Sequence, residues 1–217
     1  MAKTRLYQHF CPVARSLEVI GEKWSLLVVR DLLRGPLRFT DLQRELGGIT
    51  PKWLSLRLRD LEAAGIVARD AQLGRREVWY TLTPKGRDLA PVVEALSVWG
   101  VEHAIRPPQP DEPVHPVQTT SGIAGYLNKR GVRLARPATW LLRFAPDRAW
   151  SVGFDGSAWS VQRGEREADL LIEATPEAWV TFLLAPPDER RRLLPDLHVE
   201  GPPEQIEALV STFGWRT

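Results

Sequence analysis

Polar and basic side chains recur between residues 50 and 59 with the spacing of one helical face. At about 100° per residue, Leu54, Leu58 and Leu61 fall together on the opposite side, where they are expected to be core. Lysine and arginine can contact phosphates or donate to guanine, and leucine can touch a thymine methyl. The set suited to nucleic acid is therefore Thr50, Lys52, Ser55, Leu56 and Arg59.

A hairpin with a basic tip is expected after this helix. Residues 66–69 and 78–82 have the β-branched and aromatic character of strands, and the residues between them are polar. Arg75 and Arg76 at the tip could enter a minor groove or grip the phosphate backbone. The hairpin therefore extends the candidate surface for DNA.

The sequence also predicts the helices and the turn that position these side chains. Apolar spacing predicts two helices across residues 17–32, broken near Gly21, and a short helix across residues 39–46. Gly47-Gly48 marks a turn, and Thr50-Pro51 can cap and open the next helix. These elements predict a helix-turn-helix, of which the hairpin is the wing.

The formal net charge of +2 hides opposite charges in the two halves. Residues 1–106 carry 17 Lys and Arg against 12 Asp and Glu, and residues 107–217 carry 12 against 15. This asymmetry indicates a basic half that meets a polyanion and an acidic half with another task. Arg57 lies on the flank of the helical wheel, where an ion pair within the domain, to Asp41 or Glu45, is expected instead of a DNA contact.

A proline-rich stretch divides the chain. Residues 106–116 read RPPQPDEPVHP, and their five prolines fix φ and remove backbone donors, so an extended, semi-rigid linker is expected. The predicted organisation is a winged helix-turn-helix DNA-binding and dimerisation domain at 1–106, a linker at 107–117 and a ligand-binding domain at 118–217.

The C-terminal half changes to a period of two. Strands are expected at residues 140–144, 149–154, 159–162, 168–173 and 197–200, with turns at Asp155-Gly156 and Gly164-Glu165. Helices are expected from Thr175-Pro176, across residues 188–194 and across residues 202–213. An antiparallel sheet with helices on one face follows, so the fold class is α+β.

Several classes of protein are excluded by what the chain lacks. Cys11 is the single cysteine, no Cys/His spacing supplies a zinc site, and no apolar run approaches the roughly 20 residues of a membrane span. A nucleophile elbow, a P-loop and a zinc-protease motif are absent, and the four histidines are scattered. We expect a cytoplasmic protein that is not an enzyme, with no cofactor, metal or membrane partner.

Short motifs follow one another in a fixed order through the first half: Cys11-Pro12-Val13, Ile20-Gly21-x-Lys23-Trp24, Arg38-Phe39-x-x-Leu42, Gly48-Ile49-Thr50-x-x-x-Leu54-Ser55-x-Arg57-Leu58-x-x-Leu61, Gly65-Ile66-Val67 and Tyr80-x-Leu82-Thr83-x-x-Gly86. These motifs resemble the HxlR-type winged helix-turn-helix transcription regulators. The resemblance covers about residues 9–103 and implies a bacterial DNA-binding repressor or activator that works as a homodimer. The wing departs from the family pattern, since it reads Arg75-Arg76-Glu77-Val78-Trp79-Tyr80.

A helix expected from Thr83-Pro84 carries a broad apolar stripe that one small wing cannot cover. The pattern alone leaves two interpretations, a partner helix in a dimer or packing on the N-terminal helix of the same chain, and the family resemblance favours the dimer. The stripe consists of Leu89, Val92, Val93, Leu96, Trp99 and Gly100.

The second half contains, in this order, Ala168-Asp169-Leu170-x-Ile172, the Thr175 and Trp179 helix, and Leu197-x-Val199-Glu200-Gly201. With these residues it resembles the sterol-carrier-protein-like domain over about residues 118–215. It implies a sheet and helices around an apolar cavity that accepts hydrophobic molecules. Trp140, Trp150, Trp159 and Trp179 are candidates to line that cavity, and the alternative is that they fill it as core.

Cys11 has two interpretations. It precedes Pro12 at a helix start, where amide dipoles can lower a thiol pKa, and some relatives use a cysteine at this place to sense oxidants or electrophiles. The alternative is a small buried hydrophobe. The sequence as a whole predicts a dimeric regulator of double-stranded operator DNA with a hydrophobic effector; a thiol-based sensor, a lipid carrier and an enzyme are the alternatives.

Overall fold

The computed structural model describes residues 7–70, 77–110, 112–120, 122–145 and 148–213. The chain divides into two compact units, Met1–Val93 and Glu94–Thr217, and the division falls within helix α6 (Ala90–His103). The partition into domains at 1–106, 107–117 and 118–217 stays a prediction.

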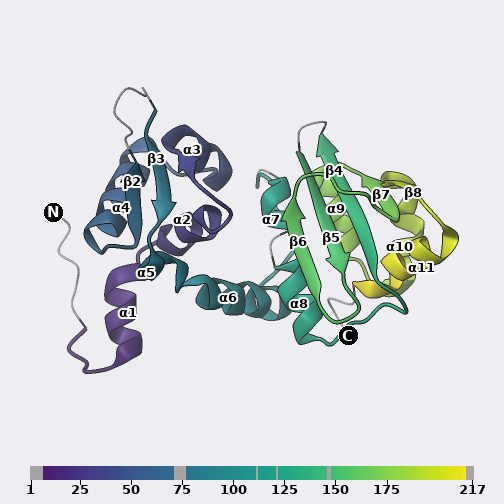
Figure 1. Cartoon of the computed structure of the whole chain (residues 1–217), viewed down its shortest axis with the longest axis horizontal. Helices are drawn as coiled ribbons and strands as arrows, with labels where there is room; N and C mark the ends of the chain where they lie inside the picture. Colours follow the sequence, from purple (N-terminus) through teal and green to yellow (C-terminus); the bar gives the residue numbers. More distant parts are fainter. Residues whose placement is uncertain (1–6, 71–76, 111, 121, 146–147, 214–217) are drawn as a thin grey trace. The chain divides into compact units, whose positions relative to one another are not determined.

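Unit one contains the expected helices and wing (Figure 1). Its small antiparallel sheet has the order β1-β3-β2, with Val67 opposite Leu82 and Asp70 opposite Trp79. The helix-turn-helix is confirmed, and both wing strands are confirmed to within one residue. The elements are α1 (Pro12–Ile20), α2 (Ser25–Leu32), β1 (Leu37–Arg38), α3 (Phe39–Leu46), α4 (Pro51–Ala63), β2 (Val67–Asp70), β3 (Trp79–Leu82) and α5 (Pro84–Arg87).

Two breaks between helices have local causes. A Cβ at Gly21 would collide with the carbonyl oxygen of Leu17, and the chain then turns through Trp24, whose φ is 80°, before α2 begins. The single helix expected from Pro84 is wrong, because α5 ends at Arg87 and α6 begins at Ala90. Pro91 lacks the N–H that a continuous helix would bond to Arg87.

Unit two is a five-stranded sheet with helices, of order β6-β5-β4-β7-β8 (Figure 1). Beyond the strands and helices expected, the sequence missed α7 and α8. The elements are α7 (Pro116–Thr120), α8 (Ile123–Lys129), β4 (Ala138–Ala145), β5 (Arg148–Phe154), β6 (Trp159–Arg163), β7 (Leu170–Glu173), α9 (Pro176–Leu184), α10 (Pro187–Leu193), a 3-10 turn η1 (Leu194–Asp196), β8 (His198–Glu200) and α11 (Pro203–Thr212).

The expectation of an antiparallel sheet is wrong for one pair of strands. β4 and β7 run parallel, with Trp140 beside Leu170 and Leu142 beside Ile172. The chain after β6 does not fold back as a hairpin; it crosses to the other side of β4, so β7 points in the same direction as β4. The sheet is mixed, and the α+β class is confirmed.

Candidate nucleic-acid interface and ligand cavity

The turn before α4 is fixed by local chemistry. Gly47 and Gly48 have φ of 54° and 65°, a left-handed region that favours glycine. Thr50 is the N-cap with an extended backbone, and its hydroxyl oxygen accepts a hydrogen bond from the Trp53 N–H at 3.3 Å. Pro51 occupies the first helical position, where a missing N–H costs nothing.

The leucine side of α4 is buried and its opposite side is open. Leu54, Leu58 and Leu61 are at most 2 % exposed and belong to the core of unit one. The structure brings the predicted α4 set together on the other side: Thr50, Lys52, Ser55 and Arg59 are exposed, and Leu56 is partly exposed. Within the described residues, neither Lys52 nor Arg59 has a carboxylate partner, so both cations are available to phosphates. Arg75 and Arg76 lie outside the described residues.

Arg57 serves the fold of unit one, as the wheel predicts. Its side chain is 7 % exposed, and its guanidinium lies 3.4 Å from Asp60 and 3.8 Å from Glu22. The predicted partners Asp41 and Glu45 are wrong, because both carboxylates pair with Arg44, which is close to them on α3. Asp60 lies one turn along α4 from Arg57, so the local pair forms instead.

Two features of this surface were missed by the sequence. Trp53 on α4 is 54 % exposed, although a tryptophan in a helix usually packs into a core. At the base of the wing, the Arg38 guanidinium lies over the Trp79 ring at 4.6 Å and pairs with Glu77 at 2.6 Å. No spacing rule points to this contact, because Arg38 and Trp79 meet only through the β1–β3 pairing.

The four candidate tryptophans of unit two lie in its core. Trp140, Trp150, Trp159 and Trp179 are at most 5 % exposed. The Trp140 indole N–H donates to Gln205 Oε1 at 2.9 Å, and that of Trp159 donates to the Val132 carbonyl at 2.9 Å. This placement matches the core alternative, and contact between these rings and a ligand stays a prediction.

A cavity of about 320 Å³ lies elsewhere in unit two. It is bounded by the residues that directly follow α6, the proline-rich segment, α7 and one residue of α9. At its edge, the Glu112 carboxylate accepts hydrogen bonds from the Gln109 N–H at 3.0 Å and from Arg106 at 2.8 Å, and these bonds lower the pKa of Glu112. The apolar lining consists of Ala104, Ile105, Pro108, Pro113, Val114 and Val180.

Cys11 is the N-cap residue of α1 and is partly exposed. It has an extended backbone, its side chain does not cap the helix, and Pro12 follows as the first helical residue. Its part in sensing oxidants stays a prediction. Across the described part of the chain, His, Cys, Asp and Glu form no group of three that could hold a metal, and no helix has the length and apolar character to cross a bilayer.

A helix-turn-helix followed by a two-stranded wing defines a DNA-binding module of the winged-helix class. The HxlR-like helix-turn-helix family model matches residues 19–107. The chain belongs to this family of transcriptional regulators through its N-terminal part.

Named relatives and a solved structure share this region. The chain is 40 % identical over 94 residues to the uncharacterized regulator sll1512 of Synechocystis, covering 42 % of this chain and 69 % of the relative. It is 41 % identical over 91 residues to the uncharacterized regulator YybR of Bacillus subtilis, covering 42 % and 73 %. The redox regulator HypR in its oxidized form is 38 % identical, with a TM-score of 0.42, over 44 % of this chain and 100 % of that one.

Proposed function

We propose that this protein is a dimeric transcription factor in which α4 enters the major groove of an operator and the C-terminal unit binds a hydrophobic effector. The observation that carries the DNA-binding part is the two-sided character of α4. Its leucines are core, while Lys52, Ser55 and Arg59 share an exposed side on which neither cation has a carboxylate partner among the described residues. Such a helix can place polar side chains on base edges and cations on phosphates.

The first experiment compares binding to the DNA upstream of the protein's own gene with binding to a scrambled duplex at several salt concentrations. Each phosphate contact that is lost should reduce the salt slope of log K by about 0.9. Lys52→Ala and Arg59→Ala should therefore lower affinity and flatten the slope. Arg136→Ala, at an exposed arginine of unit two, is the matched control and should leave both unchanged. Unchanged slopes for both α4 variants would refute the assignment.

A dimer is supported by an unusual amount of exposed apolar surface on α6. Val92, Leu96 and Trp99 are 41, 49 and 56 % exposed and recur at helical spacing. Burying these side chains against a second copy would remove them from water, which favours association. Two wings related by a two-fold axis would meet half-sites about 34 Å apart, or a multiple of that distance.

The effector part of the proposal is supported by the cavity of unit two, in a domain we propose to be sterol-carrier-like. The lining of the cavity is largely apolar, and the Arg106–Glu112 ion pair gives the cavity a polar edge. A ligand alters operator affinity only by binding two arrangements of the protein unequally.

Filling the cavity tests this site. Val180→Trp should abolish both the fluorescence of bound anilinonaphthalene sulfonate and any response of operator binding to hydrophobic ligands, while operator affinity without ligand persists. Thr181→Trp is the matched control, since Thr181 is the next residue on α9, is exposed and does not line the cavity. Equal probe binding by both variants would place the ligand elsewhere.

A further inference from the structure

The exposed large apolar side chains of the described residues are not spread evenly. All but one lie on α1 and the segment before it, on α2, or on α6 and the short segment after it. The exception is Trp53 on α4. The proposed dimer contact is carried by α6 residues and does not include Trp53. The others are Tyr7, Phe10, Val13, Leu17, Val19, Leu27, Val92, Leu96, Trp99 and Ile105.

Trp53 occupies the first turn of α4, as its third residue. The N-terminal residues of a recognition helix are those that reach base edges. Leu56 follows at the i+3 position, so the two side chains are neighbours on the helix surface. Lys52 directly precedes Trp53 and is exposed, and Arg59 lies one turn beyond Leu56. An apolar pair is therefore flanked by two cations that can hold phosphates.

The indole ring of Trp53 forms no hydrogen bond, ring stack or cation–π contact within the described part of the chain. The residue is 54 % exposed, and its backbone N–H donates to the Thr50 cap. The thymine C5-methyl is the apolar group that base pairs present in the major groove, and apolar side chains recognise it by contact. Neither Trp53 nor Leu56 carries a positive charge with which to bind a phosphate or a guanine.

We propose that Trp53, together with Leu56, reads a thymine methyl in the major groove of the operator. This inference rests on the proposed function, because it requires α4 to lie in that groove. It adds a specificity element that the basic residues of α4 do not supply, since phosphate contacts carry no sequence information.

The experiment removes the methyl and nothing else. Thymines of the protected half-site are replaced one at a time by deoxyuridine, and affinity is measured for the full-length wild-type protein and for Trp53→Ala. At one position the wild type should lose affinity about three- to fivefold, as expected for one buried methyl group. Trp53→Ala should bind the thymine duplex more weakly and show a smaller further loss at that position, because only the Leu56 contact with the methyl remains and contacting groups are not additive.

Two control variants separate this reading from other roles of the helix. Lys52→Ala should flatten the salt slope and keep the full effect of deoxyuridine. Trp53→Phe keeps an apolar ring but lacks the indole N–H, so it should retain most of the deoxyuridine effect. If Trp53→Phe weakened binding to the thymine duplex while deoxyuridine had no effect on the wild type, the indole would donate a hydrogen bond and the methyl assignment would be overturned, because deoxyuridine keeps every hydrogen-bonding group of thymine.

The remaining outcomes are equally decisive. An identical deoxyuridine effect in the wild type and in Trp53→Ala would overturn the inference, as would the absence of an effect at every thymine while the wild type still binds its site specifically. Failure of the wild type to prefer any duplex would instead refute the proposed function, and the inference with it. Circular dichroism of Trp53→Ala should match the wild type, because the side chain is largely in solvent.

Discussion

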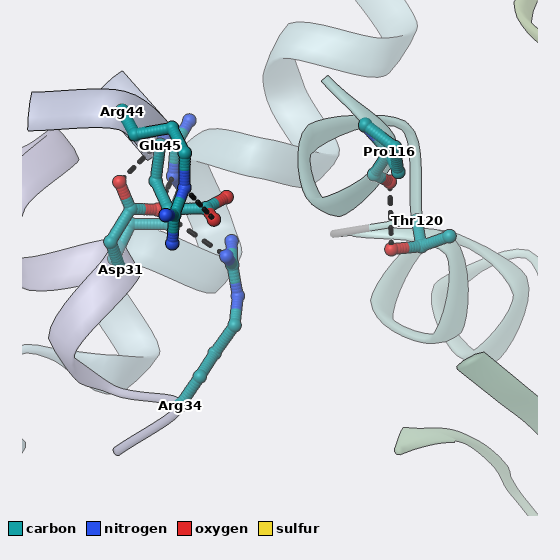
Figure 2. Close-up of polar contacts among 7 residues, drawn as sticks. Asp31, Arg34, Arg44, Glu45, Pro116 and Thr120 are labelled. Atoms are coloured by element: carbon teal, nitrogen blue, oxygen red, sulfur yellow. Dashed lines mark hydrogen bonds and ion pairs between the residues drawn. The ribbon is translucent and has the colours of Figure 1, made fainter. Parts of the chain in front are cut away.

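The Asp31 carboxylate on α2 offers the sharpest test of what holds unit one together. Its side chain has no exposed surface. Arg30 donates to both carboxylate oxygens, at 2.9 and 3.2 Å. Arg34, drawn with Asp31 in Figure 2, lies 3.4 Å from one of these oxygens. The buried negative charge is thus offset by two guanidinium groups, one from α2 and one from just after its end.

Replacing Asp31 with Asn keeps the shape of the side chain and removes its charge. Removing one partner of a buried ion pair costs about 3–5 kcal/mol, because the other charge stays buried without compensation. Here the side chains of Arg30 and Arg34 are 16 and 28 % exposed, so water can partly replace the lost carboxylate. We therefore expect a loss of about 2–3 kcal/mol in the free energy of unfolding of unit one, below the full value for a buried pair.

The assay is urea unfolding of the full-length protein, with hydrogen exchange read separately in peptides of the two units. The matched control is Glu204→Gln, which removes the carboxylate of a pair with Arg136 in which both side chains are about 60 % exposed. An exposed pair contributes about 0–1 kcal/mol, so the control should change little. If Asp31→Asn lowered the free energy of unfolding no more than Glu204→Gln does, burial would not determine the strength of the Asp31 pair.

Three further predictions use other parts of the chain. Gly86→Ala should destabilise unit one by about 1–3 kcal/mol in urea unfolding, because the added Cβ would collide with the Ile66 carbonyl oxygen. Gly100→Ala is the control: its added Cβ meets no atom within 4 Å, so it should be neutral or stabilise the protein by up to about 1 kcal/mol. The Asp155 carboxylate accepts hydrogen bonds chiefly from the Ala158 N–H and then from Ser157, and these bonds lower its pKa to about 2. Its contribution to stability should therefore be complete above pH 4 and disappear as the pH falls through 2. An NMR titration of Asp155 with a midpoint near 3.8 would contradict this prediction. Trp99→Asp should yield monomers in sedimentation experiments while Gln162→Asp, at an exposed position of β6, should not.

The helix-turn-helix was predictable because its signals are local. Thr50, Pro51 and the glycine pair each act on the backbone of their immediate neighbours, and the leucine period of α4 depends only on helix geometry. The same reasoning separates Arg57 from the exposed side of the helix without knowing its partners. Local rules therefore place both the recognition helix and its candidate DNA contacts.

Features created by distant parts of the chain were not predictable in this way. The parallel β4–β7 pair arises from a crossover after β6, and a period of two in the sequence carries no information about strand direction. The cavity likewise joins Val180 to a proline-rich segment more than 60 residues earlier, which sequence reasoning treats only as a spacer. The exposure of Trp53 was not predictable either, because it depends on which distant parts of the chain pack against α4.

The proposed dimer contact and the cavity involve consecutive stretches of the chain. Leu96 and Trp99 lie on α6, and the chain that leaves its end, through Ala104 and Ile105, lines the cavity. Trp99 and Ile105 are fewer than two helical turns apart in sequence, so a ligand that changes the end of α6 acts close to the dimer surface.

Thermodynamic linkage then requires a reciprocal effect: if a ligand alters dimerisation by some factor, dimerisation alters ligand affinity by the same factor. The monomeric Trp99→Asp variant should therefore bind anilinonaphthalene sulfonate with a changed affinity, while the Gln162→Asp control binds it as the wild type does. Equal affinities in monomer and dimer would separate the two sites energetically, and the effector would then have to act on the DNA-binding unit without changing the dimer.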